Sequence, residues 1–352
     1  MNLNHTKDIK ISKKKQTFPI NEKLKQYLIQ YDRYYGMPIN YEDLLRFNEA
    51  VPVIDSKGKD TLWASVFYEP SAMEELNDGL KRMYIRLKSD GSDLARDHLA
   101  IDSIDFCTFG NSKPFRIRVK NIFNDNHDYF YVKLSDASRV YGLELEHILS
   151  PDYINFLIQD NTLIEEHTVG IPGDLFLEKN RFVEENYIRL AKEFVKFNER
   201  CFLRLLGDQR AYNFVVVRTP DFDQTQYRIR SIDFDQQSYE GRLNLYRPQF
   251  FKENLSYVKM VKFCLDADSI EQYQHEERAL VAKRMIAEEH RYKNLMQVMK
   301  EAVISLPEKV EEMKRELLKA TKLDEFKKCR SMGDIIEVAL TDTLKNYKTT
   351  SI

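Results

Sequence analysis

The sequence is poor in cysteine. Its 352 residues include only four cysteines, and no two of them form a Cys-x-x-Cys pair: Cys107, Cys201, Cys264 and Cys329. Such wide spacing is typical of ordinary reduced thiols, and it argues against a disulfide framework or a zinc site. The seven histidines also lack the spacing of metal ligands.

Long apolar runs are absent as well. No segment approaches the roughly 20 apolar residues that cross a bilayer. The first 18 residues are polar and rich in lysine, so they lack the apolar stretch of a secretory signal. We therefore expect a cytoplasmic protein with no membrane span.

Neither sign of charge is in large excess. Lys and Arg total 54, Asp and Glu total 56, and the formal net charge is -2. This balance provides no global attraction to nucleic acid, and we expect no nucleic-acid partner. The hydrophobic content of 43% is enough for a sizeable core, and the length fits one large domain or two lobes.

The first half of the chain changes from strand to helix periodicity. Three segments with strand character are joined by short turns, which predicts an antiparallel meander: 104–109, 115–123 and 129–134. A helix is expected over 71–88 before the meander, and another over 139–149 after it. A further strand is expected over 161–167, followed by a loop around Gly170.

The second half reads as mainly helical. A long helix is expected over 184–206, stopped by Gly207, and two strands follow over 214–218 and 227–234. From Phe250 onward the pattern is helical, with an interruption at Pro307. We therefore predict an α+β protein with three parts: an N-terminal extension (1–45), a sheet-containing lobe (46–169) and a helical lobe (170–352).

Polar residues gather after the long helix. Asp208 and Asn213 lie in one short loop, and Asp233 ends the second of the two strands that follow. Phosphoryl transfer from ATP needs a carboxylate that orients the attacking hydroxyl and accepts its proton. It also needs a carboxylate and an amide oxygen that hold Mg²⁺ against the phosphates.

These two segments, 206–217 and 229–235, resemble the catalytic loop and metal-binding motif of the protein-kinase-like superfamily. Gly207-Asp208 with Asn213 is similar to the pattern of aminoglycoside and choline phosphotransferases, and Asp208-Gln209-Arg210 is similar to the phosphoinositide kinase loop. The resemblance implies a two-lobed kinase-like fold with ATP and Mg²⁺ as cofactors. It gives Asp208 the role of base, and makes Asn213 and Asp233 metal ligands.

The meander adds to the resemblance. Lys133 lies in its third strand, where kinase-like proteins place a lysine that pairs with phosphates. The next helix offers Glu144 or Glu146 as its partner, with a slight preference for Glu144. The turn at Gly110 would cover the nucleotide, although it has one glycine where the family has several. The link that begins at Glu166 would meet the adenine through its backbone.

Each of these residues also has an ordinary explanation. A strand lysine is usually solvent-facing, helix glutamates are usually exposed, and Asp208 and Asn213 suit a turn. Asp233 is harder to explain this way, because an unpaired carboxylate inside an apolar strand is costly.

The sequence thus favours a phosphotransferase acting on an unidentified hydroxyl acceptor, either a protein or a small molecule. The alternatives are an inactive pseudokinase that binds partners and an enzyme of the same fold that transfers AMP.

Overall fold

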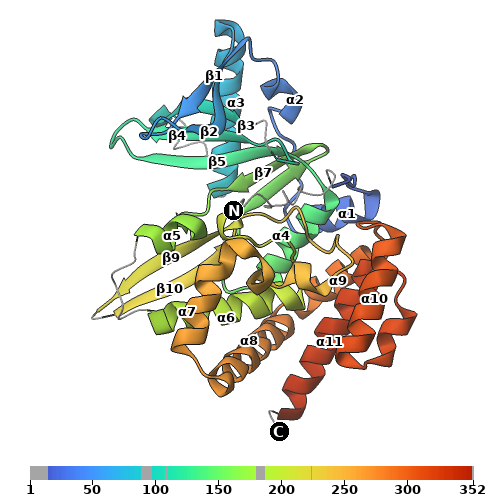
Figure 1. Ribbon diagram of the computed structural model, residues 1–352. Coiled ribbons are helices and arrows are strands. Elements are labelled where there is room, and N and C mark those ends of the chain that lie inside the picture. The colour runs from blue at the N-terminus through green and yellow to red at the C-terminus, as the bar shows by residue number, and fades with distance from the viewer. Residues whose placement is uncertain (1–14, 89–96, 108–109, 180–186, 223, 351–352) are drawn as a thin grey trace, which may run out of the picture.

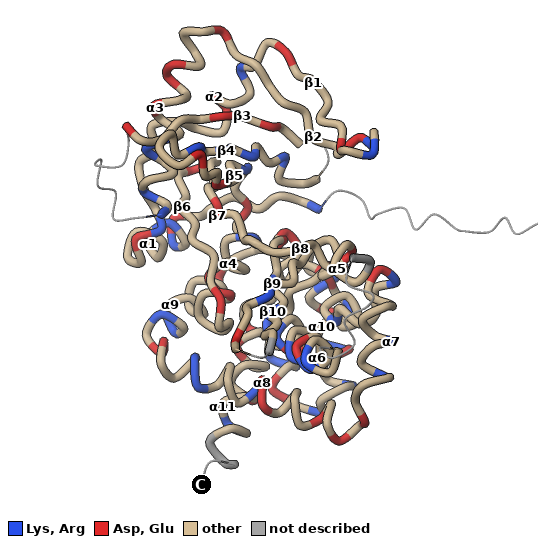
Figure 2. Tube along the Cα trace, turned by 90° about the vertical axis from the view of Figure 1, so that its left-hand side faces the viewer, with Lys and Arg blue, Asp and Glu red and all other residues tan. Residues whose placement is uncertain are grey.

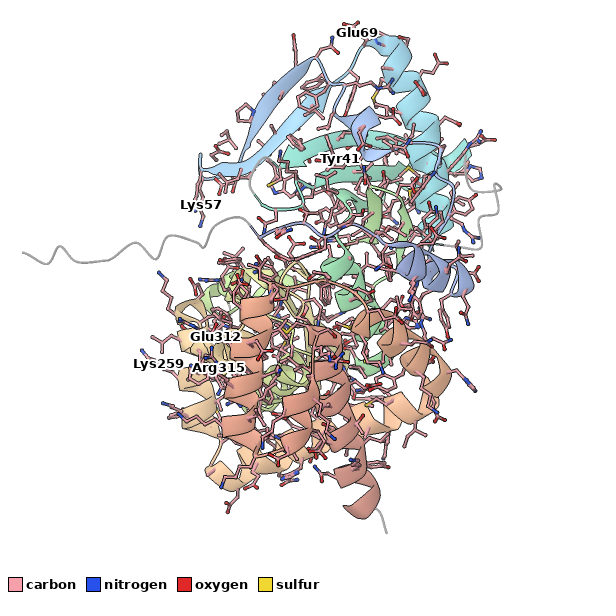
Figure 3. All side chains as sticks on the ribbon, turned by 90° about the vertical axis from the view of Figure 1, so that its right-hand side faces the viewer. Tyr41, Lys57, Glu69, Lys259, Glu312 and Arg315 are labelled. Atoms are coloured by element: carbon pink, nitrogen blue, oxygen red, sulfur yellow. The ribbon has the colours of Figure 1, made fainter. Side chains whose placement is uncertain are left out.

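The chain folds into an upper part built around a sheet and a lower part built mainly of helices (Figure 1). This computed structural model describes residues 15–88, 97–107, 110–179, 187–222 and 224–350. Figure 3 shows Tyr41 and Glu69 in the upper part and Glu312 in the lower part. This arrangement confirms the α+β architecture expected from the sequence.

The upper sheet has seven antiparallel strands in the order β1-β2-β3-β4-β5-β7-β6. Its strands are β1 (Glu49–Ile54), β2 (Asp60–Phe67), β3 (Leu99–Cys107), β4 (Phe115–Asn121), β5 (His127–Leu134), β6 (Phe156–Gln159) and β7 (Thr162–Glu166). The meander expected from the sequence is β3-β4-β5. Thr108 and Phe109, the last two residues of its first expected strand, lie outside the described residues.

One face of this sheet is apolar and covered by a helix. Helix α3 (Pro70–Lys88) packs against it, and its buried residues Leu76 and Leu80 share a core with Phe130 and Val132 of β5. Because strand side chains alternate between faces, Tyr131 and Lys133 point away from this core. They face the lower part of the molecule.

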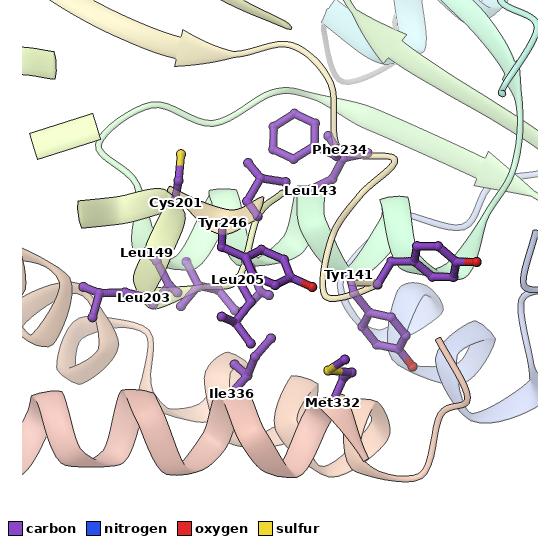
Figure 4. Close-up of a cluster of buried hydrophobic side chains, with 14 of the residues drawn as sticks. Tyr141, Leu143, Leu149, Cys201, Leu203, Leu205, Phe234, Tyr246, Met332 and Ile336 are labelled. Atoms are coloured by element: carbon purple, nitrogen blue, oxygen red, sulfur yellow. The ribbon is translucent and has the colours of Figure 1, made fainter. Parts of the chain in front are cut away.

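Helix α4 (Ala137–Leu149) leaves the sheet and enters the lower part. All but one of its 13 residues are buried. Leu143 and Leu149 pack with Leu203, Leu205 and other residues of the lower core (Figure 4). The helix that follows the lysine strand is therefore anchored in the helical part.

The lower part, which is the helical part of the molecule, also contains a small three-stranded sheet in the order β10-β9-β8. Its strands are β8 (Ile171–Pro172), β9 (Phe214–Asp221) and β10 (Gln224–Ser231). The helices of this part are α5 (Gly173–Lys179), α6 (Tyr187–Leu203), α7 (Leu255–Cys264), α8 (Ala267–Ala287), α9 (Glu289–Lys300), α10 (Pro307–Thr321) and α11 (Met332–Thr350). Helix α6 corresponds to the expected helix 184–206, whose first three residues lie outside the described residues. It ends early because Leu205 has a left-handed φ of 53°.

Two short helices precede the sheet: α1 (Glu22–Gln30) and α2 (Tyr41–Leu44). The sequence pattern of residues 41–48 is helical and agrees with α2, whereas α1 escaped prediction. Charged residues of both signs are spread over both parts of the molecule (Figure 2). In the portion of the chain that the structure describes, no helix combines the length and apolar character needed to cross a membrane.

Candidate active site

A cleft of about 380 Å³ lies between the two parts of the molecule. Five of the residues singled out in the sequence line it: Gly110, Lys133, Glu166, Asn213 and Asp233. Both parts therefore contribute expected site residues to one cavity. Asp208 and Glu144 are also described residues, but neither of them lines this cleft.

Lys133 reaches the cleft from β5 and is paired there. Its ammonium Nζ donates a hydrogen bond of 2.6 Å to Oε2 of Glu165, on the neighbouring strand β7. Burial lowers the pKa of Lys133, the positive charge of Arg139 adds to this, and Glu165 opposes it. Burial acts against ionisation of Glu165 too, but Arg139 and Lys133 outweigh it and lower the pKa of Glu165 to about 2. The lysine and the glutamate thus form a buried ion pair.

The expected partners of Lys133 were wrong. Glu144 accepts hydrogen bonds from Arg291 at 2.8 and 3.0 Å and from the hydroxyl of Tyr27 at 2.6 Å. Glu146 forms an ion pair with Arg204, the residue that follows α6. Both glutamates therefore tie α4 to the rest of the helical part instead of to the sheet.

Helix geometry explains this correction. Arg139, in the first turn of α4, is the residue of this helix that faces the cleft. Glu144 lies five positions later, which is about 140° around the helix. Glu146 returns to the face of Arg139, but about 10 Å further along the axis. Neither reaches the cleft end of α4, where Lys133 lies.

Sequence reasoning missed both Arg139 and Glu165. Arg139 is 1% exposed, and its guanidinium donates hydrogen bonds to Glu165 through Nε and Nη2. A signal for Glu165 was present, because it follows Leu163 and Ile164 in an apolar strand. The argument that a carboxylate in such a strand needs a partner was applied to Asp233 and holds equally for Glu165.

The loop after α6 is held in place by backbone and amide contacts. Asp208 has a left-handed φ of 55°, and its amide donates to the carbonyl of Leu245 at 3.2 Å. The Asn213 side-chain Nδ2 donates to the carbonyl of Asp208 at 2.7 Å. Buried Gln209 donates to the carbonyl of Asp233 at 2.8 Å, which links this loop to the end of the hairpin. Asp208, Asn213 and Asp233 are thereby brought together.

The Asp208 carboxylate lies beside a basic residue. Its Oδ1 accepts a hydrogen bond of 2.7 Å from Nε of Arg210, which also binds Glu253 at 2.9 Å. Burial raises the pKa of Asp208, and the contact with Arg210 opposes that rise. The side chain is 36% exposed, so solvent reaches it.

Asp233 and Asn213 supply the oxygens that suit Mg²⁺. Nδ2 of Asn213 donates to the Asp208 carbonyl, so its amide oxygen is the atom that could bind a metal ion. Oδ1 of Asp233 accepts from Arg139 Nη1 at 3.0 Å, and the side chain is 32% exposed. Within the described residues there is no group of three or more His, Cys, Asp and Glu that could hold a metal. Mg²⁺ does not require one, because one or two carboxylates plus phosphate oxygens and water usually bind it.

The two carboxyl groups that follow β10, those of Asp233 and Asp235, have pKa values shifted in opposite directions. Burial raises the pKa of Asp233, and the charge of nearby Asp235 raises it further. Burial has the same effect on Asp235, but Arg139 outweighs it and lowers the pKa of Asp235. The difference follows the geometry, since Arg139 Nη1 is 2.6 Å from Asp235 and 3.0 Å from Asp233.

The Gly110 turn and the link at Glu166 complete the cleft. Gly110 has a φ of 114°, which favours glycine. Its turn is hydrogen-bonded to β5: the amide of Leu134 donates to the Ser112 carbonyl at 3.2 Å. The amide of Glu166 already donates to the Asn155 carbonyl at 2.9 Å, and its carboxylate pairs with Lys88. Its amide is therefore engaged within the protein instead of facing the cleft.

No family model and no curated protein matches this chain. Among solved structures, the Rio2 kinase of Chaetomium thermophilum, in its complex with ADP, Mg²⁺ and phosphoaspartate, has 9% identity and a TM-score of 0.29, and the match covers 86% of this chain and 82% of that one. An ethanolamine kinase of Plasmodium vivax has 14% identity and a TM-score of 0.31, with coverage of 74% and 92%.

An antiparallel sheet precedes a mainly helical part, which is the α+β arrangement that the resemblance in the motifs implies. At TM-scores near 0.3, the two similarities carry no argument about individual residues or activity. Those are argued below from the chain's own geometry.

Proposed function

We propose that this protein is an ATP- and Mg²⁺-dependent phosphotransferase that acts on a hydroxyl group of a protein or small molecule. One observation carries the proposal: Lys133 from the sheet and Asn213 and Asp233 from the helical part line the same cleft. These are the groups that phosphoryl transfer needs on both sides of a nucleotide.

The residues present fit a nucleotide with its metal ion. The Asn213 amide oxygen and the Asp233 carboxylate would hold Mg²⁺, which would neutralise charge on the phosphates. The Lys133 ammonium would contact the phosphates, and Glu165 holds that ammonium in the cleft at 2.6 Å. Burial makes such a charge contact stronger than it would be in water.

Asp208 is assigned the role of general base. It would orient the acceptor hydroxyl and take its proton as the hydroxyl oxygen attacks the terminal phosphate. Burial raises its pKa, which makes the carboxylate a better proton acceptor than an exposed aspartate. Arg210 fixes one carboxylate oxygen, so the other is left for the acceptor.

The test is ATP consumption and phosphate transfer by the wild type, Asp208→Ala and Asp233→Ala. We expect both variants to lose at least about a hundredfold in rate, the range contributed by one general base or one electrostatic contact. Asp221→Ala, at the exposed hairpin tip, is the matched control and should keep wild-type activity. Turnover that survives both active-site substitutions would contradict the proposal. The mass added to the acceptor, that of phosphate or that of AMP, would distinguish the two transfer reactions.

A second candidate is a nucleotide-binding protein without catalysis. It is favoured by the internal contacts of the two key carboxylates, since Arg210 binds Asp208 and Arg139 binds Asp233. Retained binding of Mg²⁺ and ATP with no transfer to any acceptor would support this candidate. Phosphate transfer that depends on Asp208 would eliminate it.

A further inference from the structure

Arg139 lies at the centre of a buried charge network on the cleft wall. Nε and Nη2 of its guanidinium bind the Glu165 carboxylate. Nη1 binds Oδ1 of Asp233 at 3.0 Å and Oδ1 of Asp235 at 2.6 Å. All three carboxylates therefore contact one cation that belongs to the protein itself.

The position of the Arg139 guanidinium affects how a metal ion can bind to Asp233. The same carboxylate that the proposed function assigns to Mg²⁺, that of Asp233, already has a cationic partner. A divalent cation arriving without nucleotide meets the guanidinium as a like charge and must share the carboxylate with it. Like charges a few ångströms apart repel each other even at the effective dielectric of a protein surface.

The network as a whole is also close to electrical balance. Lys133 and Arg139 contribute two positive charges, and the carboxylates of Glu165, Asp233 and Asp235 contribute up to three negative ones. At most one negative charge is left to attract a free metal ion. The phosphates of a nucleotide would bring the negative charge that the protein lacks.

We propose that Arg139 competes with the divalent cation for Asp233, so that the metal binds tightly only together with the nucleotide. The inference rests on the proposed function for the assignment of Asp233 as a metal ligand. Arg139 is then a positioning residue: in the absence of metal it holds Asp233, and it sets the coupling between metal and nucleotide.

The experiment measures binding of Mn²⁺ alone, as a spectroscopic substitute for Mg²⁺, by electron paramagnetic resonance. We expect weak binding by the wild type and binding at least about tenfold tighter by Arg139→Met, because the competing charge is gone. A merely structural role for Arg139 would predict the opposite, since a disordered site binds metal less tightly. Unchanged or weaker Mn²⁺ binding by folded Arg139→Met would overturn the inference.

Two further variants make the result specific. Lys133→Met removes an equal charge, and we expect it to strengthen Mn²⁺ binding by no more than about threefold, because Lys133 is hydrogen-bonded to Glu165 whereas Arg139 is hydrogen-bonded to Asp233 itself. An equal gain in both variants would show a general charge effect and would also overturn the inference. Arg139→Lys keeps a cation for Glu165 but cannot span to Asp233 at the same time. It should bind Mn²⁺ at least about threefold tighter than the wild type, and it decides the question if Arg139→Met does not fold.

A second titration separates this inference from the proposed function. Adding a non-hydrolysable ATP analogue should strengthen Mn²⁺ binding more in the wild type than in Arg139→Met or Arg139→Lys. Equal strengthening in all three proteins would count against competition by Arg139. Absence of any analogue binding by the wild type would contradict the proposed function, whereas the comparison with metal alone would still report on Arg139.

Discussion

Lys133 on β5 donates a 2.6 Å hydrogen bond to Glu165 on β7, and both side chains are buried. The two residues are not directly opposite each other, because Lys133 pairs in register with Leu163 and Tyr131 pairs with Glu165. The ion pair is therefore diagonal across the two strands. It fixes the lysine at the cleft without help from a glutamate of α4.

The first prediction concerns the stability that Glu165 provides. Glu165→Gln leaves Lys133 and Arg139 without their shared buried carboxylate, and removal of one partner of a buried pair costs roughly 3–5 kcal/mol. Urea unfolding at pH 7 measures this loss. Glu166→Gln is the matched control, because its partly exposed pair with Lys88 should contribute less than about 1 kcal/mol. Equal losses in the two variants would contradict the assignment.

The effect of Glu165→Gln on the free energy of unfolding should depend on pH. The pKa of Glu165 is lowered from 4.5 to about 2 in the folded protein, so the unfolded chain binds its proton first as the pH falls. The stability that Glu165 contributes is fully present above pH 4.5 and is lost as the pH falls towards 2. The difference in unfolding free energy between wild type and Glu165→Gln should therefore narrow over this window. A difference that stays constant would contradict the lowered pKa.

The second prediction concerns His147, on α4. Burial, followed by the charges of Arg291 and Arg33, lowers its pKa to about 4. Between pH 6.5 and about 4 the unfolded chain binds a proton at this residue that the folded protein does not, so stability decreases as the pH falls. His147→Gln should remove this part of the decrease, as measured by unfolding at several pH values.

His275 provides the control for that measurement. It is largely exposed on α8 and lies 3.5 Å from Glu271. His275→Gln should keep the wild-type dependence on pH between 6.5 and 4. The account of His147 would be wrong if its substitution left the dependence unchanged as well.

The third prediction concerns Asp136, the N-cap of α4. Its Oδ1 accepts a hydrogen bond from the amide of Ser138 at 2.8 Å, and it also binds Lys15 and the amide of Phe18. Asp136→Ala should cost about 1–2 kcal/mol for the cap alone. It should also weaken binding of Mg²⁺ and ATP, because this cap positions the turn that carries Arg139.

A second N-cap serves as the control. Asp266 caps α8 at an exposed position, through a 2.8 Å hydrogen bond from the amide of Ser269. Asp266→Ala should lower the melting temperature without changing nucleotide affinity, which thermal shift and calorimetry measure together. A loss of nucleotide affinity equal to that of Asp136→Ala would contradict a specific role for the α4 cap.

Local patterns in the sequence were sufficient for much of the fold. The strand expected over 129–134 corresponds to β5, because strand character is a local signal in the sequence. The helix and loop before Asp208 were predicted for a similar reason, since apolar spacing and a glycine stop are local signals. The α+β architecture followed from the order of these elements.

Such local patterns could not predict the charge network around Arg139. The contact between Arg139 and Asp233 joins residues 94 positions apart, and nothing local to either one specifies it. The choice between Glu144 and Glu146 failed because it depends on how α4 is rotated against the helical part. That rotation is set by partners such as the partly buried Arg291 and the buried Arg204, which the local sequence does not reveal.

Calorimetric binding of Mg²⁺ and ATP tests the central claim most directly. The proteins to compare are the wild type, Lys133→Ala and Asp233→Ala, with Asp221→Ala as the control. The account predicts Mg²⁺-dependent binding by the wild type and the control, and affinity lower by at least about tenfold in the other two variants, since each loses a charged contact. No binding by the folded wild type, or unchanged binding by Lys133→Ala and Asp233→Ala, would contradict it.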